Sequence, residues 1–166
     1  MLLFGHIGLT LGIFYLISVL TKRKFSYPLI IIGSILPDLI DKPLGRIILP
    51  LGSGRLIGHT LAFLLILIII GLSLVSIGLY WQMLTLAIAD ALHLIEDRMW
   101  EQPAILFWPL LGGFHFHKAI SINEYILDLL QGLHPSLSIS FVSEVAGFLI
   151  LLAYFAVQVR KYFRGS

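Results

Sequence analysis

Residues 56–89 read LIGHTLAFLLILIIIGLSLVSIGLYWQMLTLAIA and contain no Asp, Glu, Lys or Arg. As one continuous helix this stretch would be about 50 Å long, well beyond the roughly 30 Å of a bilayer's hydrocarbon core. Within it, residues 78–82 combine Gly, Tyr, Trp and Gln, a composition typical of a turn at the membrane surface. The stretch therefore predicts two successive apolar helices, residues 59–79 and 82–97.

Apolar segments continue on both sides of this stretch. The first one, residues 2–21, is followed by Lys22-Arg23-Lys24, whereas a cleaved signal peptide has its basic residues before the apolar run, so we expect an uncleaved first helix. The other expected segments are a shorter second helix at residues 26–37, an irregular or interfacial segment at 98–137 and a last helix at 138–159. Together they predict a single all-α polytopic membrane domain over residues 1–166, with about four full spans plus the shorter second helix.

The composition of the chain also excludes a soluble monomer. Hydrophobic residues make up 58% and charged residues 12% of its 166 residues, and the mean hydropathy is +0.99. A soluble domain has about 25% charged residues, and a chain this short cannot bury so much apolar surface within itself. We expect membrane lipid to cover that surface, while the oligomeric state stays open. The net charge of +2 is too small for a nucleic-acid partner, and the absence of Cys excludes disulfides and thiolate ligands.

The charged residues are sorted along the chain. If the helices cross the membrane in turn, the basic residues within 22–24 and 160–164 share one side, and the 9 Asp and Glu and the 6 His residues lie towards the other. The positive-inside rule makes the basic side, with the C-terminus, cytoplasmic. The residues that could carry chemistry are then expected on the extracytoplasmic side.

Ionisable residues near membrane helices are costly and therefore mark candidate functional sites. At about 100° per residue, Asp90, His93 and Asp97 lie within roughly 60° of one another on one helix face. His93 and Asp97, four residues apart, can chelate one metal ion, and Asp90 is either a further ligand or a partner that orients His93. Other helix ends at the same membrane level add His6, Asp38, Asp41 and His59. This donor set fits one or two Zn²⁺ ions, with Mn²⁺ as the alternative.

Further polar residues have two interpretations each. Arg46 and Arg55 are suited to bidentate phosphate contacts, or else pair with nearby carboxylates or lipid headgroups. His115 and His117 alternate with Phe and would share a face of an extended segment, where they complete a second metal site or belong to an interfacial belt.

Three segments, GSILPDLID (residues 33–41), GRLIGHT (54–60) and HLIED (93–97), together with the early His6, resemble the inner-membrane metal-dependent hydrolases of bacteria and archaea. That family is similar to the secreted zinc-dependent phospholipase C fold. The resemblance covers most of the first 110 residues and implies an inner-membrane location. It implies that the metal ligands are His6, Asp38, His59, His93 and Asp97, with Asp41 as the second carboxylate of the Pro-Asp motif and Arg55 as an Arg shortly before the Thr-His pair. The sequence departs from the family at Gly54, where His is common, and at Gly58, where Thr is common.

These residues lead to one expected function and two alternatives. We expect a membrane-embedded metal-dependent hydrolase that cleaves a phosphate ester of a lipid or other amphiphile with metal-activated water. In this mechanism Asp38 orients or deprotonates the water, and Arg55, with Arg46, neutralises the developing phosphoryl charge. The alternatives are a metal or proton transporter and a non-catalytic scaffold with a structural metal site. The absence of a Gly-rich phosphate loop and of a Gly-x-Ser-x-Gly elbow disfavours a nucleotide enzyme or a serine hydrolase.

Overall fold

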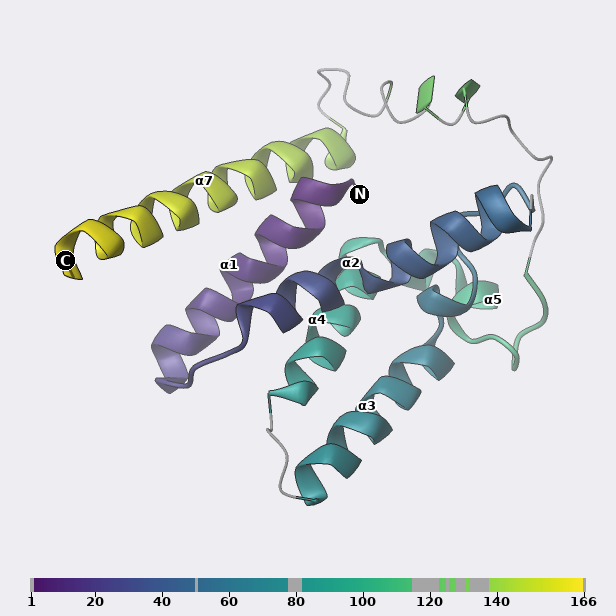
Figure 1. Ribbon diagram of the computed structural model, residues 1–166. Helices are drawn as coiled ribbons and strands as arrows, with labels where there is room; N and C mark the ends of the chain where they lie inside the picture. Colours follow the sequence, from purple (N-terminus) through teal and green to yellow (C-terminus); the bar gives the residue numbers. More distant parts are fainter. Residues whose placement is uncertain are drawn as a thin grey trace.

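The computed structural model describes residues 2–49, 51–77, 82–114, 123–124, 126–127, 131 and 138–165. Within these ranges the chain forms helices and connecting loops and no strand, which confirms the expected all-α class (Figure 1). The longer helices are α1 (Leu3–Thr21), α2 (Tyr27–Pro43), α3 (Leu61–Ser76), α4 (Met83–Glu96) and α7 (Ile139–Gly165). Short helical segments are the π-helix η1 (Leu44–Ile48), the 3₁₀ turns η2 (Ile57–His59) and η3 (Met99–Glu101), and α5 (Pro103–Leu106).

Within the described ranges, two helices are long and apolar enough to cross a membrane: α1, with 19 residues, and the first 22 residues of α7, Ile139–Arg160. The expected count of about four full spans is not supported by the described residues. Helix α3 has 16 residues and α4 has 14, so they are about 24 and 21 Å long, shorter than a bilayer's hydrocarbon core. Helix α3 begins at Leu61, later than expected, and residues 56–60 before it are not α-helical. Its first turn is capped by the Thr60 hydroxyl, which accepts a hydrogen bond from Phe63 N at 3.1 Å.

The second helix is longer than the expected residues 26–37. Helix α2 continues through Pro37 to Pro43, so that Asp38 and Asp41 lie on the helix rather than after its end. Pro37 removes one backbone donor from the helix without ending it. Its ring is fully buried, and a Cβ atom at Gly58 would lie 2.9 Å from its Cα, so η2 packs directly against this part of α2.

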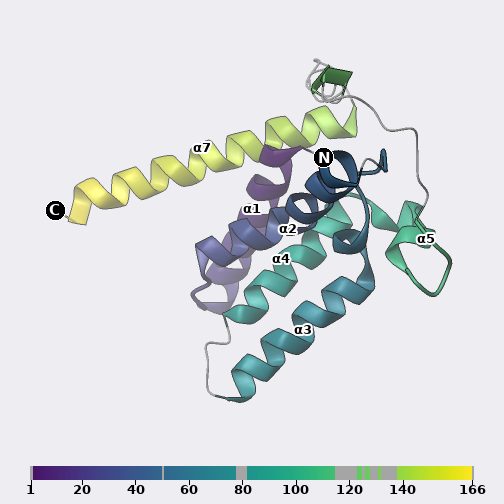
Figure 2. The same cartoon turned by 45° about the vertical axis from the view of Figure 1, so that its right-hand side comes forward.

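Helices α2 and α4 approach each other closely, with α1 beside them and α3 against the other flank of α4 (Figure 2). A Cβ atom at Gly33 of α2 would lie 2.5 Å from the carbonyl oxygen of Leu86 in α4, so the two backbones are in contact. A small apolar core joins α1, α2 and α4 through Leu11, Phe14, Ile30 and Ala89. This packing brings one end of α1, the C-terminal half of α2 and the end of α4 to the same place.

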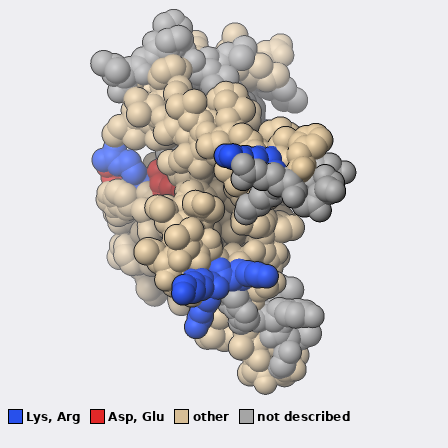
Figure 3. All heavy atoms as spheres, turned by 90° about the vertical axis from the view of Figure 1, so that its left-hand side faces the viewer, with Lys and Arg blue, Asp and Glu red and all other residues tan. Residues whose placement is uncertain are grey.

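Helix α7 packs on α1, and its C-terminal end projects beyond the other helices in both ribbon views. Its exposed side chains include Leu149, Leu152 and Phe155. The face drawn in Figure 3 is mostly uncharged, with Lys, Arg, Asp and Glu confined to a few small groups. An exterior of this kind is suited to contact with lipid.

Candidate metal centre

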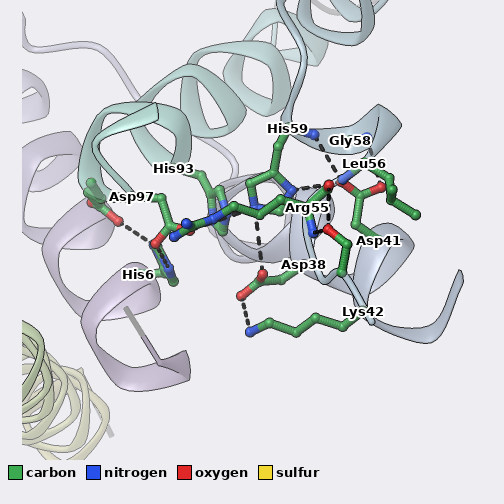
Figure 4. A network of polar contacts seen from close by, with 12 residues as sticks. His6, Asp38, Asp41, Lys42, Arg55, Leu56, Gly58, His59, His93 and Asp97 are labelled. Carbon is green, nitrogen blue, oxygen red and sulfur yellow. Dashed lines mark hydrogen bonds and ion pairs between the residues drawn. The ribbon is translucent and has the colours of Figure 1, made fainter. Parts of the chain in front are cut away.

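Three buried histidines from separate elements meet carboxylates at one site (Figure 4). His6 comes from α1, His59 from η2 and His93 from α4, and none of their side chains is exposed. The carboxylates that join them are Asp38 and Asp41 of α2 and Asp97, which directly follows α4. The structure thus brings together residues that lie up to 91 positions apart in the sequence, and it does so at the end of the bundle where α1 begins and α4 ends.

His93 is held by the backbone of the neighbouring helix. Its Nδ1 lies 2.7 Å from the carbonyl oxygen of Ser34 in α2. A carbonyl oxygen only accepts hydrogen bonds, so Nδ1 carries the proton and donates it. The opposite nitrogen, Nε2, is therefore a lone-pair donor for a cation and points into the cluster.

His59 is oriented in the same manner by a carboxylate. Its Nδ1 lies 2.7 Å from Asp41 Oδ2, and its Nε2 lies 3.3 Å from His93 Nε2. With both Nδ1 atoms acting as donors, two nitrogen lone pairs would face each other across this distance. A proton or a metal ion between them removes that repulsion, so the pair is built to hold a positive charge.

His6 completes the pattern from α1. Its Nδ1 lies 2.8 Å from Glu96 Oε2, and Thr10 of the same helix donates to the other oxygen of Glu96 at 3.0 Å. The His6 Nε2 atom is buried without a hydrogen-bond partner and lies 3.3 Å from Asp97 Oδ1. Its ring stacks on that of His93 with 4.0 Å between the centroids. A buried imidazole nitrogen that makes no hydrogen bond, next to a carboxylate oxygen, is suited to share a metal ion with that oxygen.

Two overlapping groups of ligand atoms have the spacing that a metal ion requires. His6, His93 and Asp97 form one group, and Asp38, His59 and His93 form the other; within each, the atoms lie within 4.8 Å of one another. His93 belongs to both groups. It can bind only one ion, through Nε2, since its Nδ1 is engaged by Ser34. Nitrogen and carboxylate donors in this ratio suit Zn²⁺ and are acceptable to Mn²⁺.

Asp41 lies behind the ligand atoms rather than among them. Its Oδ1 accepts from Gly58 N at 2.9 Å, and its Oδ2 accepts from Leu56 N at 2.6 Å and from His59 N at 3.1 Å, besides the ring of His59. Both oxygens are occupied by these donors. The geometry therefore favours a role in shaping η2 and orienting His59 over the expected role as a metal ligand.

Asp90 also differs from its expected place. It lies on α4 with its carboxylate fully buried, and neither oxygen has a hydrogen-bond partner. Neither of the two groups of closely spaced ligand atoms includes it. The structure thus places Asp90 about one helical turn deeper along α4 than His93, beside the cluster rather than in it.

An open cleft of about 690 Å³ lies over the cluster and includes Asp38 and Asp97 in its lining. Its other walls carry the cations Lys42, Arg46 and Arg55 and the loop at residues 52–54. Lys42 Nζ lies 2.5 Å from Asp38 Oδ2, and Arg55 holds Asp97 Oδ2 through Nε at 3.2 Å and Nη2 at 2.8 Å. The cleft therefore combines these three cations with the carboxylates of Asp38, Asp97 and Glu101, beside an apolar wall at residues 103–105.

The charges of the cluster act on the groups at its edge. Burial acts to lower the pKa of His59, but the contacts with Asp41 and Asp97 outweigh it and raise that pKa above its ordinary value. Burial acts to raise the pKa of Asp97, yet the contacts with His59, His6 and Arg55 hold it far below its usual range. Excess negative charge therefore favours a cation at this place, whether it is a proton on His59 or a metal ion.

Sequence reasoning missed several residues that hold the cluster. Glu96 points towards α1 and lies off the helix face that carries Asp90, His93 and Asp97. Its link to His6 depends on how α1 and α4 pack. Lys42 carried a local signal, since it stands four residues after Asp38 on one helix. His115, His117 and residues 78–81 lie outside the described residues, as does most of the segment 115–137.

Comparison with known proteins places the chain beside a described family. The family model described as YdjM inner membrane protein matches residues 1–164. No curated protein and no solved structure matches the chain. The matched range contains every residue of the cluster and all three cations of the cleft.

Proposed function

The chain belongs to the YdjM inner membrane protein family, and we propose that it is a membrane-embedded metal-dependent hydrolase that cleaves a phosphate ester of a lipid or another amphiphile. As a member of this family it is an inner membrane protein, with lipid as its environment. The observation that carries the proposal is the position of the ligand cluster at the floor of a cleft whose walls hold Lys42, Arg46 and Arg55. A metal site beside three cationic side chains is suited to an anionic substrate.

The residues that would hold the metal are those whose free donor atoms converge. They are His6, Asp38, His59, His93 and Asp97, and the two overlapping groups allow one or two ions. The His6 Nε2 atom, which makes no hydrogen bond, and the facing Nε2 atoms of His59 and His93 fit this role. Zn²⁺ is the ion we propose, with Mn²⁺ as the alternative. When bound, such an ion supplies a Lewis acid that makes water a nucleophile near neutral pH.

Residues on the cleft side would perform the remaining tasks. Asp38 lies between the cluster and the cleft, since its Oδ1 is 3.7 Å from His59 Nε2 and its Oδ2 contacts Lys42. It is placed to orient a water molecule and to accept its proton. Arg55 and Arg46, together with Lys42, would neutralise the charge that develops on the phosphoryl oxygens.

The membrane arrangement supports an amphiphilic substrate. We propose that α1, α3, α4 and α7 cross the membrane and that α2 returns the chain between α1 and α3, with the C-terminus cytoplasmic and the cleft on the extracytoplasmic side. The basic residues at 22–24 and in the C-terminal tail support this orientation. A lipid could then reach the cleft from the bilayer, with its headgroup at the level of the cluster.

One observation favours a second candidate function, a metal or proton transporter. Asp90 and Thr85 are fully buried on α4, and both have side-chain oxygens without a hydrogen-bond partner. Unpartnered polar groups inside a membrane helix are typical of ion pathways. A transporter would move metal or protons into sealed vesicles in a manner that depends on Asp90, whereas a hydrolase would not.

The experiment that tests the proposal starts with metal analysis of the detergent-purified protein. We expect about one or two Zn²⁺ per chain and hydrolysis of a phosphomonoester, a phosphodiester or a phospholipid in mixed micelles. His93→Ala and Asp97→Ala should remove both, while Ser73→Ala, whose hydroxyl donates to the Ile69 carbonyl of its own helix, should change neither. Absence of stoichiometric metal in the wild-type protein would refute the metal site. Bound metal without hydrolysis of any of the three substrates would refute the hydrolase and favour the scaffold or the transporter.

A further inference from the structure

Glu144 is a buried carboxylate in the apolar helix α7, and it belongs to neither the cluster nor the cleft. Its side chain is only 4% exposed. Its Oε1 accepts a hydrogen bond from Leu2 N at 2.6 Å, and its Oε2 accepts one from Phe4 N at 3.0 Å. Both donors belong to the start of α1, so Glu144 caps one helix from another.

The start of α1 depends on this cap. The first backbone N–H groups of a helix have no partner within the helix, and a Ser, Thr, Asp or Asn side chain at its N-terminus normally satisfies some of them. Here the N-cap residue is Leu2, which provides no such bond, and the first turn contains no acidic residue. A carboxylate also interacts favourably with the positive end of the helix dipole.

The capped turn leads directly to His6. The backbone N–H of His6 donates to the carbonyl oxygen of Leu2 at 3.4 Å, which closes the first turn of α1. If the Leu2 and Phe4 amides lost their partner, this long bond would be the next to open as the turn frays. The His6 ring would then lose its fixed position relative to Glu96 and Asp97.

Helix α7 is itself fixed against α1 by backbone contact. A Cβ atom at Gly147 would lie 2.1 Å from the carbonyl oxygen of Phe4, and one at Gly8 would lie 2.1 Å from the carbonyl oxygen of Gly147. Only glycine permits this approach, which sets the position of Glu144 along α1. The same two helices pair Phe4 with Phe148, whose ring centroids are 5.6 Å apart.

We propose that Glu144 is a positioning residue for the metal centre: from α7 it holds the first turn of α1 so that His6 Nε2 stays directed at the ligand cluster. The inference rests on the proposed function for the identity of the cluster as a metal site. It assigns the C-terminal helix a part in metal binding although α7 contributes no ligand. It also explains why a carboxylate is retained in an apolar, membrane-spanning helix.

The test measures metal affinity by competition with a chelator in the full-length protein. Glu144→Ala should weaken Zn²⁺ binding about ten- to hundredfold, the range seen when groups that orient ligands are removed. Glu144→Gln keeps one acceptor oxygen and should lie between Glu144→Ala and the wild type. Ser143→Ala is the matched control on α7, because its hydroxyl donates to the Ile139 carbonyl of its own helix, and it should bind Zn²⁺ like the wild type. Equal affinity of Glu144→Ala and the wild type would overturn the proposal.

A crosslink separates this role from a general loss of packing. Since the chain contains 0 Cys, Phe4→Cys and Phe148→Cys introduce one pair that reports the contact between α1 and α7. We expect the disulfide to form equally well with and without Glu144→Ala, because the Gly8–Gly147 contact remains. Loss of crosslinking together with loss of metal would show that α7 has detached, and would overturn the specific role of Glu144.

A third measurement does not require metal. In the metal-free protein, amide hydrogen exchange over residues 3–6 should accelerate about fivefold in Glu144→Ala, as expected for loss of a helix cap. Unchanged exchange would overturn the proposal even if the wild type bound no metal. If the wild type binds no metal but exchange is faster in the variant, the proposed function is refuted, whereas the role of Glu144 as a helix cap stands.

Discussion

The Nε2 atoms of His59 and His93 lie 3.3 Å apart, and each ring uses its Nδ1 on a fixed acceptor, Asp41 Oδ2 and the carbonyl oxygen of Ser34. Two neutral imidazoles held in this way present lone pairs to each other. The acceptors behind the rings therefore create a site that is stable only with a positive charge at its centre.

Removal of metal should destabilise the folded protein. An ion that binds only the folded state contributes about 2.7 kcal/mol when its free concentration is a hundred times Kd. Chelation should therefore lower the thermal unfolding midpoint of the wild type, followed by intrinsic Trp fluorescence in detergent. His93→Ala should unfold at the same temperature with and without the chelator, whereas Ser73→Ala should respond like the wild type. A wild-type midpoint that does not respond to chelation would contradict the prediction.

The two carboxylates of α2 should behave differently. Asp41→Asn places an amide NH₂ against backbone N–H donors of η2, so we expect a loss of about 1–3 kcal/mol of folding free energy, with weaker metal binding as a consequence. Asp38→Asn removes a partly exposed contact with Lys42 and should lower metal affinity with little change in unfolding. Parallel unfolding and metal titrations compare them, and equal losses of stability in both variants would refute the distinction.

The contact between α2 and α4 should be sensitive to a single methyl group. In Gly33→Ala the new Cβ would lie 2.5 Å from the carbonyl oxygen of Leu86, so the helices must separate, at a cost of about 1–3 kcal/mol. The separation should also weaken metal binding, because the Ser34 contact that orients His93 spans the same pair of helices. Gly113→Ala has nothing within 4 Å of the new atom and is the matched control. Similar unfolding midpoints for the two variants would show that the helices are less tightly packed than described.

Arg46 should affect the substrate and not the metal. Gly54 leaves room for its guanidinium, since a Cβ atom there would lie 3.0 Å from Arg46 Nε at the cleft wall. If the cleft binds a phosphate ester, Arg46→Ala should lower kcat/KM about tenfold, the loss of one charge-assisted hydrogen bond, while bound metal stays at the wild-type level. Arg23→Ala, which lies outside the cleft lining, should leave kcat/KM unchanged. Loss of metal in Arg46→Ala would contradict this division of roles.

Much of the architecture was predictable because hydrophobic content is a local property. The uncharged stretches over residues 2–21 and 56–89 require helices in a membrane whatever their neighbours are, and helices α1, α3 and α4 form within them. The lengths were not predictable to the same degree. Residues 56–60 are apolar enough for a helix, but they form a loop and a 3₁₀ turn because the Asp41 carboxylate takes their backbone N–H groups.

The candidate site was also predictable only in part. Residue identity and spacing were enough to collect His6, Asp38, His59, His93 and Asp97, since histidines and carboxylates at one end of apolar helices have few other uses. Their roles could not be assigned from spacing. Asp41 shares a helix with Asp38, yet the rotation of α2 turns it to η2. Glu96 lies next to Asp97, yet it faces α1.

The chain's own residues thus specified an apolar helical protein with its polar donors concentrated at one membrane level. Packing specified which donors meet: the contact of Gly33 with α4, of Gly58 with Pro37 and of Gly147 with α1 sets the rotation and register of each helix. A side chain's direction depends on that rotation, and rotation arises from contacts between residues far apart in the sequence. For this reason the acceptors behind the histidines, and the cap that Glu144 places on α1, become visible only when the helices are assembled.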